Sequence, residues 1–100
     1  MKTFRTYELA VQFYRSIKNL HLPAHLKSQL LRAASSVALN LAEGRGKFTR
    51  PDQRRFQQIA FGSVRECQAI FDLIDDDYLA QAELLDHLAA SLFKLLRTGH

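Results

Sequence analysis

The spacing of apolar residues constrains the fold of this chain more than any other feature of its sequence. Four stretches carry apolar residues at alternating intervals of three and four, and only short breaks separate them. This spacing keeps apolar side chains on one face of an α-helix. We expect helices over about 3–19, 23–43 and 49–74, and a fourth that is capped by Asp76 or Asp77 and stops at Gly99.

No stretch has the apolar–polar alternation of a strand that would compete with these helices. Four amphipathic helices with short connections predict an all-α fold, an antiparallel up-down-up-down four-helix bundle. One hundred residues suit one modest core, so we expect residues 1–100 to form a single domain. The expected core comprises Ala10, Phe13, Ile17, Leu20, Leu26, Leu30, Ala33, Val37, Leu41, Phe56, Ile59, Ala60, Ser63, Cys67, Ile70, Ile74, Leu85, Leu88, Leu92 and Leu95.

Proline, glycine and threonine mark the breaks between the helices. Pro23 suits the first turn of the second helix. Gly44 can adopt the left-handed conformation that ends many helices. The hydroxyl of Thr49 can accept a hydrogen bond from the backbone N–H of Asp52 and so cap the third helix.

The composition is that of an ordinary soluble protein, with 47% hydrophobic and 24% charged residues. No apolar run approaches the roughly 18 residues that span a bilayer, and the first residues lack the pattern of a secretory signal. A single cysteine, Cys67, fits a reducing compartment. We therefore expect a cytoplasmic protein that does not enter a membrane.

Charge is divided unevenly along the chain. Residues 1–65 hold 12 basic and three acidic side chains, whereas residues 66–100 hold two basic and seven acidic ones. The expected connectivity places both termini and the second connection at one pole, where these cations gather: Lys2, Arg5, Arg45, Lys47, Arg50, Arg54, Arg55, Lys94 and Arg97. The opposite pole collects Asp72, Asp75, Asp76, Asp77 and Glu83. Such polarity indicates a polyanionic partner.

No catalytic, metal or cofactor site is indicated. The segment "GRGKFTR" lacks the leading glycine and the Ser or Thr of a phosphate-binding P-loop. His21 and His25 have no third ligand nearby, and Pro23 lies between them. Cys67 falls on the core stripe, where a thiol behaves as a small hydrophobic group.

Two polar surfaces exceed what solubility requires. On the third helix, an outer stripe combines guanidiniums and amides around an aromatic ring: Arg50, Arg54, Gln57, Gln58, Phe61 and Arg65. It is either a contact surface for phosphate or carboxylate groups or a solvated face. On the second helix, Arg32, Ser36, Asn40 and Glu43 share an arc of about 80°. They form either a buried polar network or a solvated flank, and Gly62 and Ser63 of the third helix would permit close approach.

The stretch "SSVALNLAEGRGKFTRPDQRRFQQIAFGSVRECQAIFDLI", with "YELAVQFYRSI" before it, resembles the small bacterial four-helix-bundle proteins first named for their genes within intervening sequences of 23S ribosomal RNA genes. The family's characteristic positions are filled here by Ser36, Asn40, Ala42, Glu43, Gly44, Ile59, Ala60, Gly62, Ser63 and Glu66. The pattern adds Glu66 to the expected polar network. The fourth helix is richer in alanine than the family pattern.

The resemblance implies a non-enzymatic bundle that assembles into a homopentameric ring. It also extends to an accessory protein of diversity-generating retroelements, a basic pentamer that binds nucleic acid and a reverse transcriptase. Combined with the charge pattern, it favours a nucleic-acid-binding accessory protein, for RNA or DNA, whose phosphate contacts come from Arg45, Lys47, Arg50, Arg54, Arg55 and Arg65. The alternative is a scaffold that docks an acidic protein. Apolar residues beyond the core stripes, Phe61, Val64 and Phe71, are the expected oligomer interface.

Overall fold

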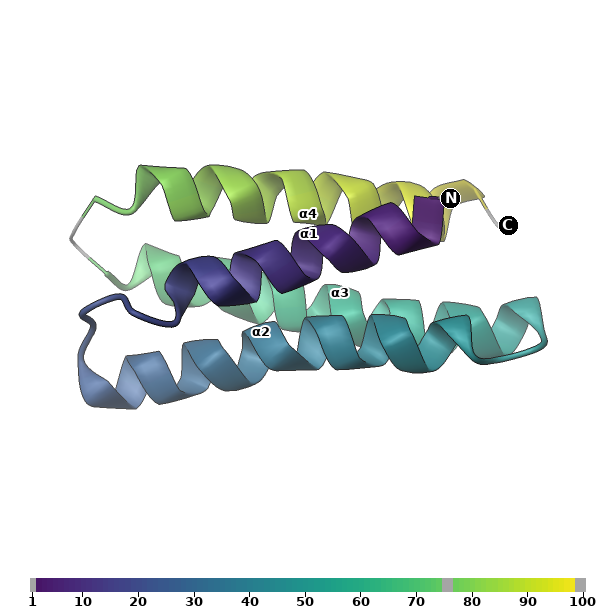
Figure 1. Cartoon of the computed structure of the whole chain (residues 1–100), viewed down its shortest axis with the longest axis horizontal. Coiled ribbons are helices and arrows are strands. Elements are labelled where there is room, and N and C mark those ends of the chain that lie inside the picture. Colours follow the sequence, from purple (N-terminus) through teal and green to yellow (C-terminus); the bar gives the residue numbers. More distant parts are fainter. Residues whose placement is uncertain (1, 75–76, 99–100) are drawn as a thin grey trace.

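The structure, a computed structural model, describes residues 2–74 and 77–98. It contains four helices within those residues and no strand: α1 (Lys2–Ile17), α2 (Ala24–Arg45), α3 (Arg50–Asp72) and α4 (Leu79–Thr98). The prediction of an all-α fold with four helices is confirmed. The helices pack side by side in a body of 41 × 20 × 19 Å (Figure 1).

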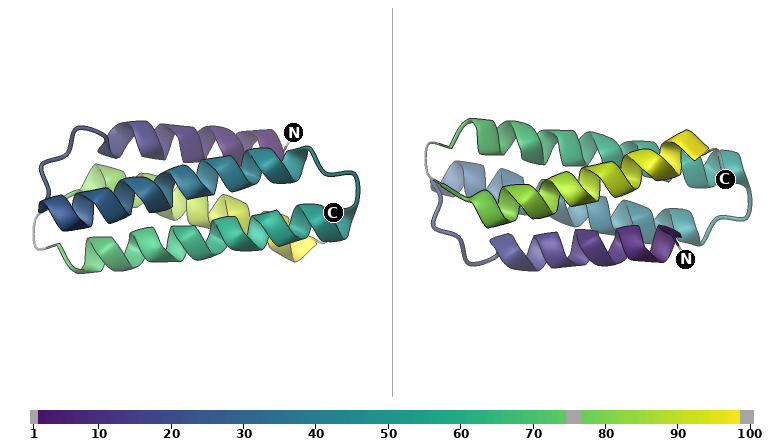
Figure 2. Two further views of the ribbon diagram at one scale, coloured as in Figure 1. Left: turned by 90° about the horizontal axis from the view of Figure 1, so that it is seen from below. Right: turned by 90° about the horizontal axis from the view of Figure 1, so that it is seen from above.

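Each helix packs against two neighbours, in the pairs α1–α2, α2–α3, α3–α4 and α1–α4. The two views of Figure 2 show α2 beside α3 on one side of the bundle and α4 between α1 and α3 on another. The start of α1, the end of α4 and the α2–α3 connection lie at one end (Figure 1). We call this end the basic pole.

The helix starts follow from local hydrogen bonding. The backbone N–H of Asp52 donates to Thr49 Oγ1 over 3.3 Å, so the predicted cap of α3 is confirmed. Asp77 Oδ1 accepts from the N–H of Leu79 over 3.0 Å at the start of α4. The alternative cap, Asp76, lies outside the described residues, as do Asp75 and Gly99.

The prediction that Gly44 ends α2 in a left-handed conformation is wrong. The helix continues to Arg45, and its C-cap is Gly46 with a right-handed φ of −83°. Gly44 is buried instead, and a Cβ there would lie 3.1 Å from Phe56 Cβ and 3.4 Å from the backbone O of Gln53. Gly44 therefore permits the close approach of α2 to α3.

Gly62 does not provide the close approach to α2 that the sequence predicted for it. It is exposed on α3, and a Cβ there would meet no heavy atom within 4 Å. The contact between α2 and α3 instead uses Ser63, one residue further on, whose hydroxyl reaches α2. Glycine at position 62 is thus unexplained by packing within the described chain.

Most of the expected core is buried. All four leucines of α4 expected there are at most 3% exposed, and so are the central residues of the other three stripes: Ala10, Phe13, Ile17, Leu30, Ala33, Val37, Leu41, Ala60, Cys67 and Ile70. Ile59 differs, because it is 46% exposed. Val64 was not expected in the core, but the structure buries it. It is fully buried between Ala60 and Cys67 on the inner stripe of α3, so its assignment to an oligomer interface is wrong.

The two phenylalanines expected at that interface are half-buried. Phe71 packs edge-on against Phe13 with ring centroids 6.2 Å apart, and also contacts Tyr78. Phe61 lies beside Phe93 of α4, with ring centroids 6.3 Å apart. Both rings therefore help to close the bundle, and both remain partly accessible.

Candidate nucleic-acid interface

The α2–α3 connection forms the tip of the basic pole and carries an exposed aromatic ring between cations. Arg45 and Arg55 are exposed, Lys47 is half-buried, and Phe48 is fully exposed. The carboxylate of Glu43 forms an ion pair with Lys47 Nζ over 3.3 Å. The cations therefore outnumber the acids at this tip, whose other carboxylate belongs to Asp52.

Aromatic rings hold these cations in place. The guanidinium of Arg45 lies 5.0 Å from the ring centroid of Phe4 on α1. Lys47 and Arg55 lie 5.2 and 5.4 Å from the ring centroid of Phe56. Such contacts restrain each cation, and they leave the guanidinium N–H groups of Arg45 and Arg55 able to donate to a ligand. Arg45, Lys47 and Arg55 are the members of the predicted phosphate-binding set that the structure places together at the tip.

Arg50 and Arg54 have partners within the bundle. Arg50 donates to Gln57 Oε1 and to the backbone O of Leu95, each over 2.9 Å, and Arg54 donates to the backbone O of Leu96. These carbonyls belong to the last turns of α4, where no further helical N–H is available to satisfy them. Arg50 and Arg54 therefore join the start of α3 to the end of α4, a role that sequence reasoning missed.

Two other members of the expected outer stripe differ from prediction. Gln57 is 4% exposed and accepts from Arg50, so it faces inward. Arg65 is exposed but lies roughly 20 Å along α3 from Arg50, given a rise of about 1.5 Å per residue. Its guanidinium lies 4.7 Å from the Phe61 centroid and donates to Gln68 Oε1. Arg65 is thus remote from the basic pole.

The polar network between α2 and α3 is smaller than predicted. Asn40 Nδ2 donates to the backbone O and to Oγ of Ser36 over 2.8 and 3.0 Å, and Ser63 Oγ lies 2.9 Å from Ser36 Oγ. Three expected members, Arg32, Glu43 and Glu66, are exposed and take no part in it. The hydroxyl of Ser63 completes the network. The small residues Gly62 and Ser63, expected to face α2, were the sequence signal for this contact.

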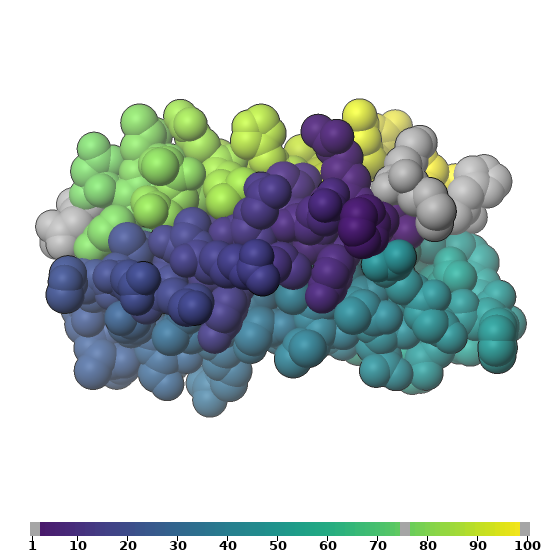
Figure 3. Space-filling view, in the orientation of Figure 1, coloured from purple at the N-terminus to yellow at the C-terminus, as the bar shows by residue number. Residues whose placement is uncertain are grey.

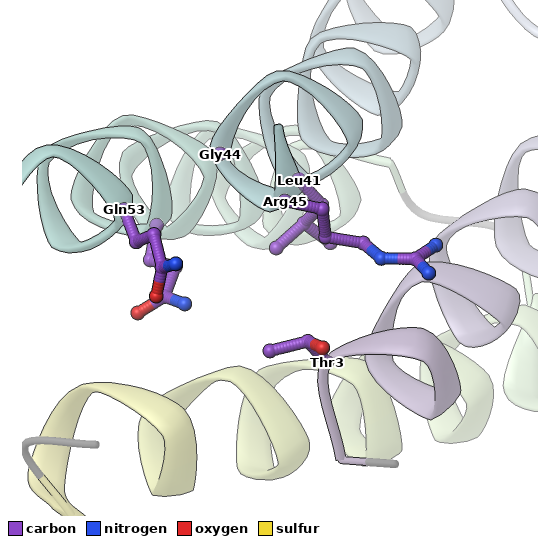
Figure 4. A pocket seen from close by; sticks show the side chains of 6 residues that line it. Thr3, Leu41, Gly44, Arg45 and Gln53 are labelled. Carbon is purple, nitrogen blue, oxygen red and sulfur yellow. The ribbon is translucent and has the colours of Figure 1, made fainter. Parts of the chain in front are cut away.

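A cavity of about 220 Å³ opens beneath the tip of the pole. It is lined by Thr3 of α1, by Leu41, Gly44 and Arg45 of α2, and by Gln53 and Gln57 of α3. Figure 4 shows Thr3 and Gln53 pointing into this space while the guanidinium of Arg45 extends toward α1. Gln53 also donates to the backbone O of Lys47 over 3.0 Å, which ties the wall of the cavity to the connection.

A larger groove of about 790 Å³ follows the seam between α1 and α4 and was not anticipated from the sequence. Its apolar floor includes Leu9 and Leu95, and its rim carries Arg5, Lys94 and Arg97. Figure 3 shows α1 and α4 side by side on this face. No acidic side chain lines the groove among the described residues. We call it the α1–α4 groove.

The remaining reactive groups are isolated. Burial raises the pKa of the Cys67 thiol from its ordinary 9.0 to about 12, and the nearby charge of Glu66 adds to the increase. Within residues 2–74 and 77–98, no three His, Cys, Asp or Glu side chains gather in a way that could hold a metal ion. None of the described helices is both long and apolar enough to cross a membrane.

Four helices around an apolar core, with cations concentrated at one end, define a small basic helical-bundle protein. The chain belongs to the 23S rRNA-intervening sequence protein family, whose model matches residues 3–98. The resemblance drawn from the motifs of α2 and α3 is thereby confirmed. No curated protein and no solved structure matches the chain.

Proposed function

We propose that this protein is a non-enzymatic, cytoplasmic nucleic-acid-binding protein that contacts phosphates through its basic pole. The observation that carries the proposal is the placement of Arg45, Lys47 and Arg55 around one exposed connection, each restrained by an aromatic ring. The name of the family, which refers to ribosomal RNA, makes RNA the first ligand to test. The placement of the connections in Figures 1 and 2 supports an antiparallel up-down-up-down bundle, which brings the cations together.

The test compares two variants with equal changes in charge. Arg45→Glu with Arg55→Glu alters the basic pole, whereas Arg15→Glu with Lys18→Glu alters exposed cations near the opposite end of the bundle. Binding to a random-sequence RNA is measured over a series of salt concentrations. The first variant should bind more weakly and reduce the slope of log K against log salt by about 1.4, since each lost phosphate contact contributes about 0.7. Equal losses in both variants would refute a localised site.

We further propose that the protein acts as a homo-oligomer, a five-membered ring as its family resemblance implies. Support comes from large apolar side chains left in solvent, including Leu39 at 67% and Ile59 at 46% exposure. Leu39→Glu should reduce the mass measured by light scattering. Ser28→Glu, a change at an exposed polar residue of the same helix, is the control and should leave the mass unchanged. A wild-type protein with the mass of one chain would exclude assembly.

The α1–α4 groove favours a second candidate function, the docking of a protein partner. An apolar floor with a rim of Arg5, Lys94 and Arg97 complements an amphipathic helix whose apolar stripe is flanked by carboxylates. A synthetic helix with leucines on one face and glutamates beside them is the probe. Lys94→Glu with Arg97→Glu should abolish its binding, and a peptide of the same composition in scrambled order should not bind.

A further inference from the structure

Phe48 is the most exposed large apolar side chain among the described residues. It stands fully in solvent at the tip of the basic pole, whereas the next most exposed, Leu73, is 69% exposed. Two other phenylalanines near this pole, Phe4 and Phe56, each lie beneath a cation. No ring or cation contact to Phe48 is present within the described residues. Its ring is therefore available on both faces.

The backbone that carries this ring is held on both sides. Before it, the N–H groups of Gly46 and Lys47 donate to the backbone O atoms of Glu43 and Gly44, each over 3.1 Å. The backbone O of Lys47 accepts from Gln53 Nε2 over 3.0 Å. A ligand that used this ring would meet a preformed connection, so little conformational freedom would be lost on binding.

Hydrogen bonding also fixes the residue after the ring. Thr49 caps α3 through its hydroxyl, and its backbone O accepts from the N–H of Gln53 over 3.0 Å. Polar residues and glycine are the usual occupants of such an ordered turn. Phenylalanine adds nothing to the turn itself, since its side chain points away from the bundle into solvent. Its presence indicates a surface that becomes covered by a ligand.

We propose that Phe48 stacks on an unpaired base, so that the basic pole selects single-stranded RNA or DNA over duplex. This inference rests on the proposed function and adds the class of nucleic acid. The ring follows Lys47 directly, and Arg45 and Arg55 belong to the same tip, so the ligand that covers the ring must also be anionic. A single strand offers both a π-face on each base and a phosphate between bases. In a duplex the base faces are already stacked on one another.

The chain contains no tryptophan, which gives a direct optical test. Phe48→Trp keeps an aromatic ring at the tip and makes it the only tryptophan in the protein. Its emission should be quenched when a 15-nucleotide single strand of random sequence is added. A blunt-ended duplex of a 15-nucleotide strand with its complement, which offers no unpaired base, should leave the emission unchanged.

Affinity measurements on two further variants separate stacking from simple apolar contact. Phe48→Ala should weaken single-strand binding roughly 5- to 150-fold, which corresponds to the loss of one base–aromatic stack. Phe48→Leu should weaken it similarly, because leucine is apolar but has no π-face. Leu73→Ala, at the exposed apolar residue that directly follows α3 and lies far from the tip, is the control and should bind as the parent does.

The outcomes distinguish this inference from the function on which it rests. If Phe48→Ala binds single strands as tightly as the parent while Arg45→Glu with Arg55→Glu does not, base stacking is refuted and phosphate binding stands. If Phe48→Ala loses single-strand and duplex affinity equally, the selection of single strands is refuted. If Phe48→Leu retains full affinity, the ring is an apolar contact and stacking is again refuted. A parent protein that binds neither form would refute both proposals.

Discussion

Gly44 and Gly62 allow one chemical change to be made at two helical positions with opposite expected effects on stability. At Gly62 an added Cβ meets no heavy atom within 4 Å. Alanine is favoured over glycine within a helix by about 0.8–1.0 kcal/mol. Gly62→Ala should therefore raise the free energy of unfolding by about 0.5–1 kcal/mol.

At Gly44 the same helical preference is opposed by the contact with α3. The new Cβ would lie 3.1 Å from Phe56 Cβ, an atom bonded directly to the backbone that cannot rotate away. The two helices would have to separate by a few tenths of an ångström, and overpacking of this kind costs about 1–3 kcal/mol. After the gain in helix propensity is subtracted, Gly44→Ala should lower the free energy of unfolding by up to about 2 kcal/mol.

Urea unfolding followed by circular dichroism measures both changes, and thermal melts should separate the two variants by several degrees or more, since about 1 kcal/mol shifts the Tm of a domain this size by about 4–8 °C. The melts are repeated over a range of protein concentrations because assembly adds stability by mass action. A Gly44→Ala protein that is more stable than the parent would refute the close-approach argument. A Gly62→Ala protein that is less stable than the parent only at high protein concentration would indicate that Gly62 packs against a second copy of the chain.

Three further predictions concern contacts between helices. Ser63→Ala removes the hydrogen bond to Ser36 and should lower the free energy of unfolding by about 0.5–1.5 kcal/mol in urea titrations. An unchanged free energy of unfolding would show that water replaces this hydrogen bond at no cost. Arg50→Lys cannot span both Gln57 Oε1 and the Leu95 carbonyl, so hydrogen exchange in the last turn of α4 should accelerate; unchanged protection would show that this link is dispensable. Because the Cys67 pKa is raised to about 12 in the folded state, the unfolded thiol loses its proton first, and stability should fall as pH rises above about 9. Cys67→Ala should lack that part of the pH dependence, which urea titrations at several pH values will show.

The sequence was sufficient for the helices and most of the core because both depend on local periodicity. Leu85, Leu88 and Leu92 repeat at three and four residues, and the structure buries all of them. Val64 was misassigned although its spacing from Ala60 and Cys67 follows the same rule. The large rings of Phe61 and Phe71 nearby suggest an outer surface, but the step of four residues from Ala60 places Val64 on the inner stripe.

The candidate site was less predictable because its geometry depends on where distant segments end. Arg54 is exposed in any helical-wheel projection of α3, yet its guanidinium reaches the Leu96 carbonyl on α4. Nothing within α3 indicates that the last turn of α4 stops beside it. The α1–α4 groove is similar, since its rim joins Arg5 to Arg97, which are far apart in sequence. Side chains that meet only through tertiary packing leave no periodic signal.

The links from Arg50 and Arg54 to the end of α4 also bear on the order in which the bundle can form during synthesis. When α1, α2 and α3 have left the ribosome, every cation of the tip is exposed. The carbonyls of Leu95 and Leu96 have not yet emerged at that stage. Until they do, Arg54 lacks this acceptor and Arg50 keeps only its bond to Gln57, and the face of α1 that packs on α4 through Thr6 and Ser91 is uncovered. The nascent chain therefore has more unpaired guanidinium N–H groups at this end than the folded protein does. Completion of α4 withdraws two arginines from solvent and leaves the tip with its mature set of cations.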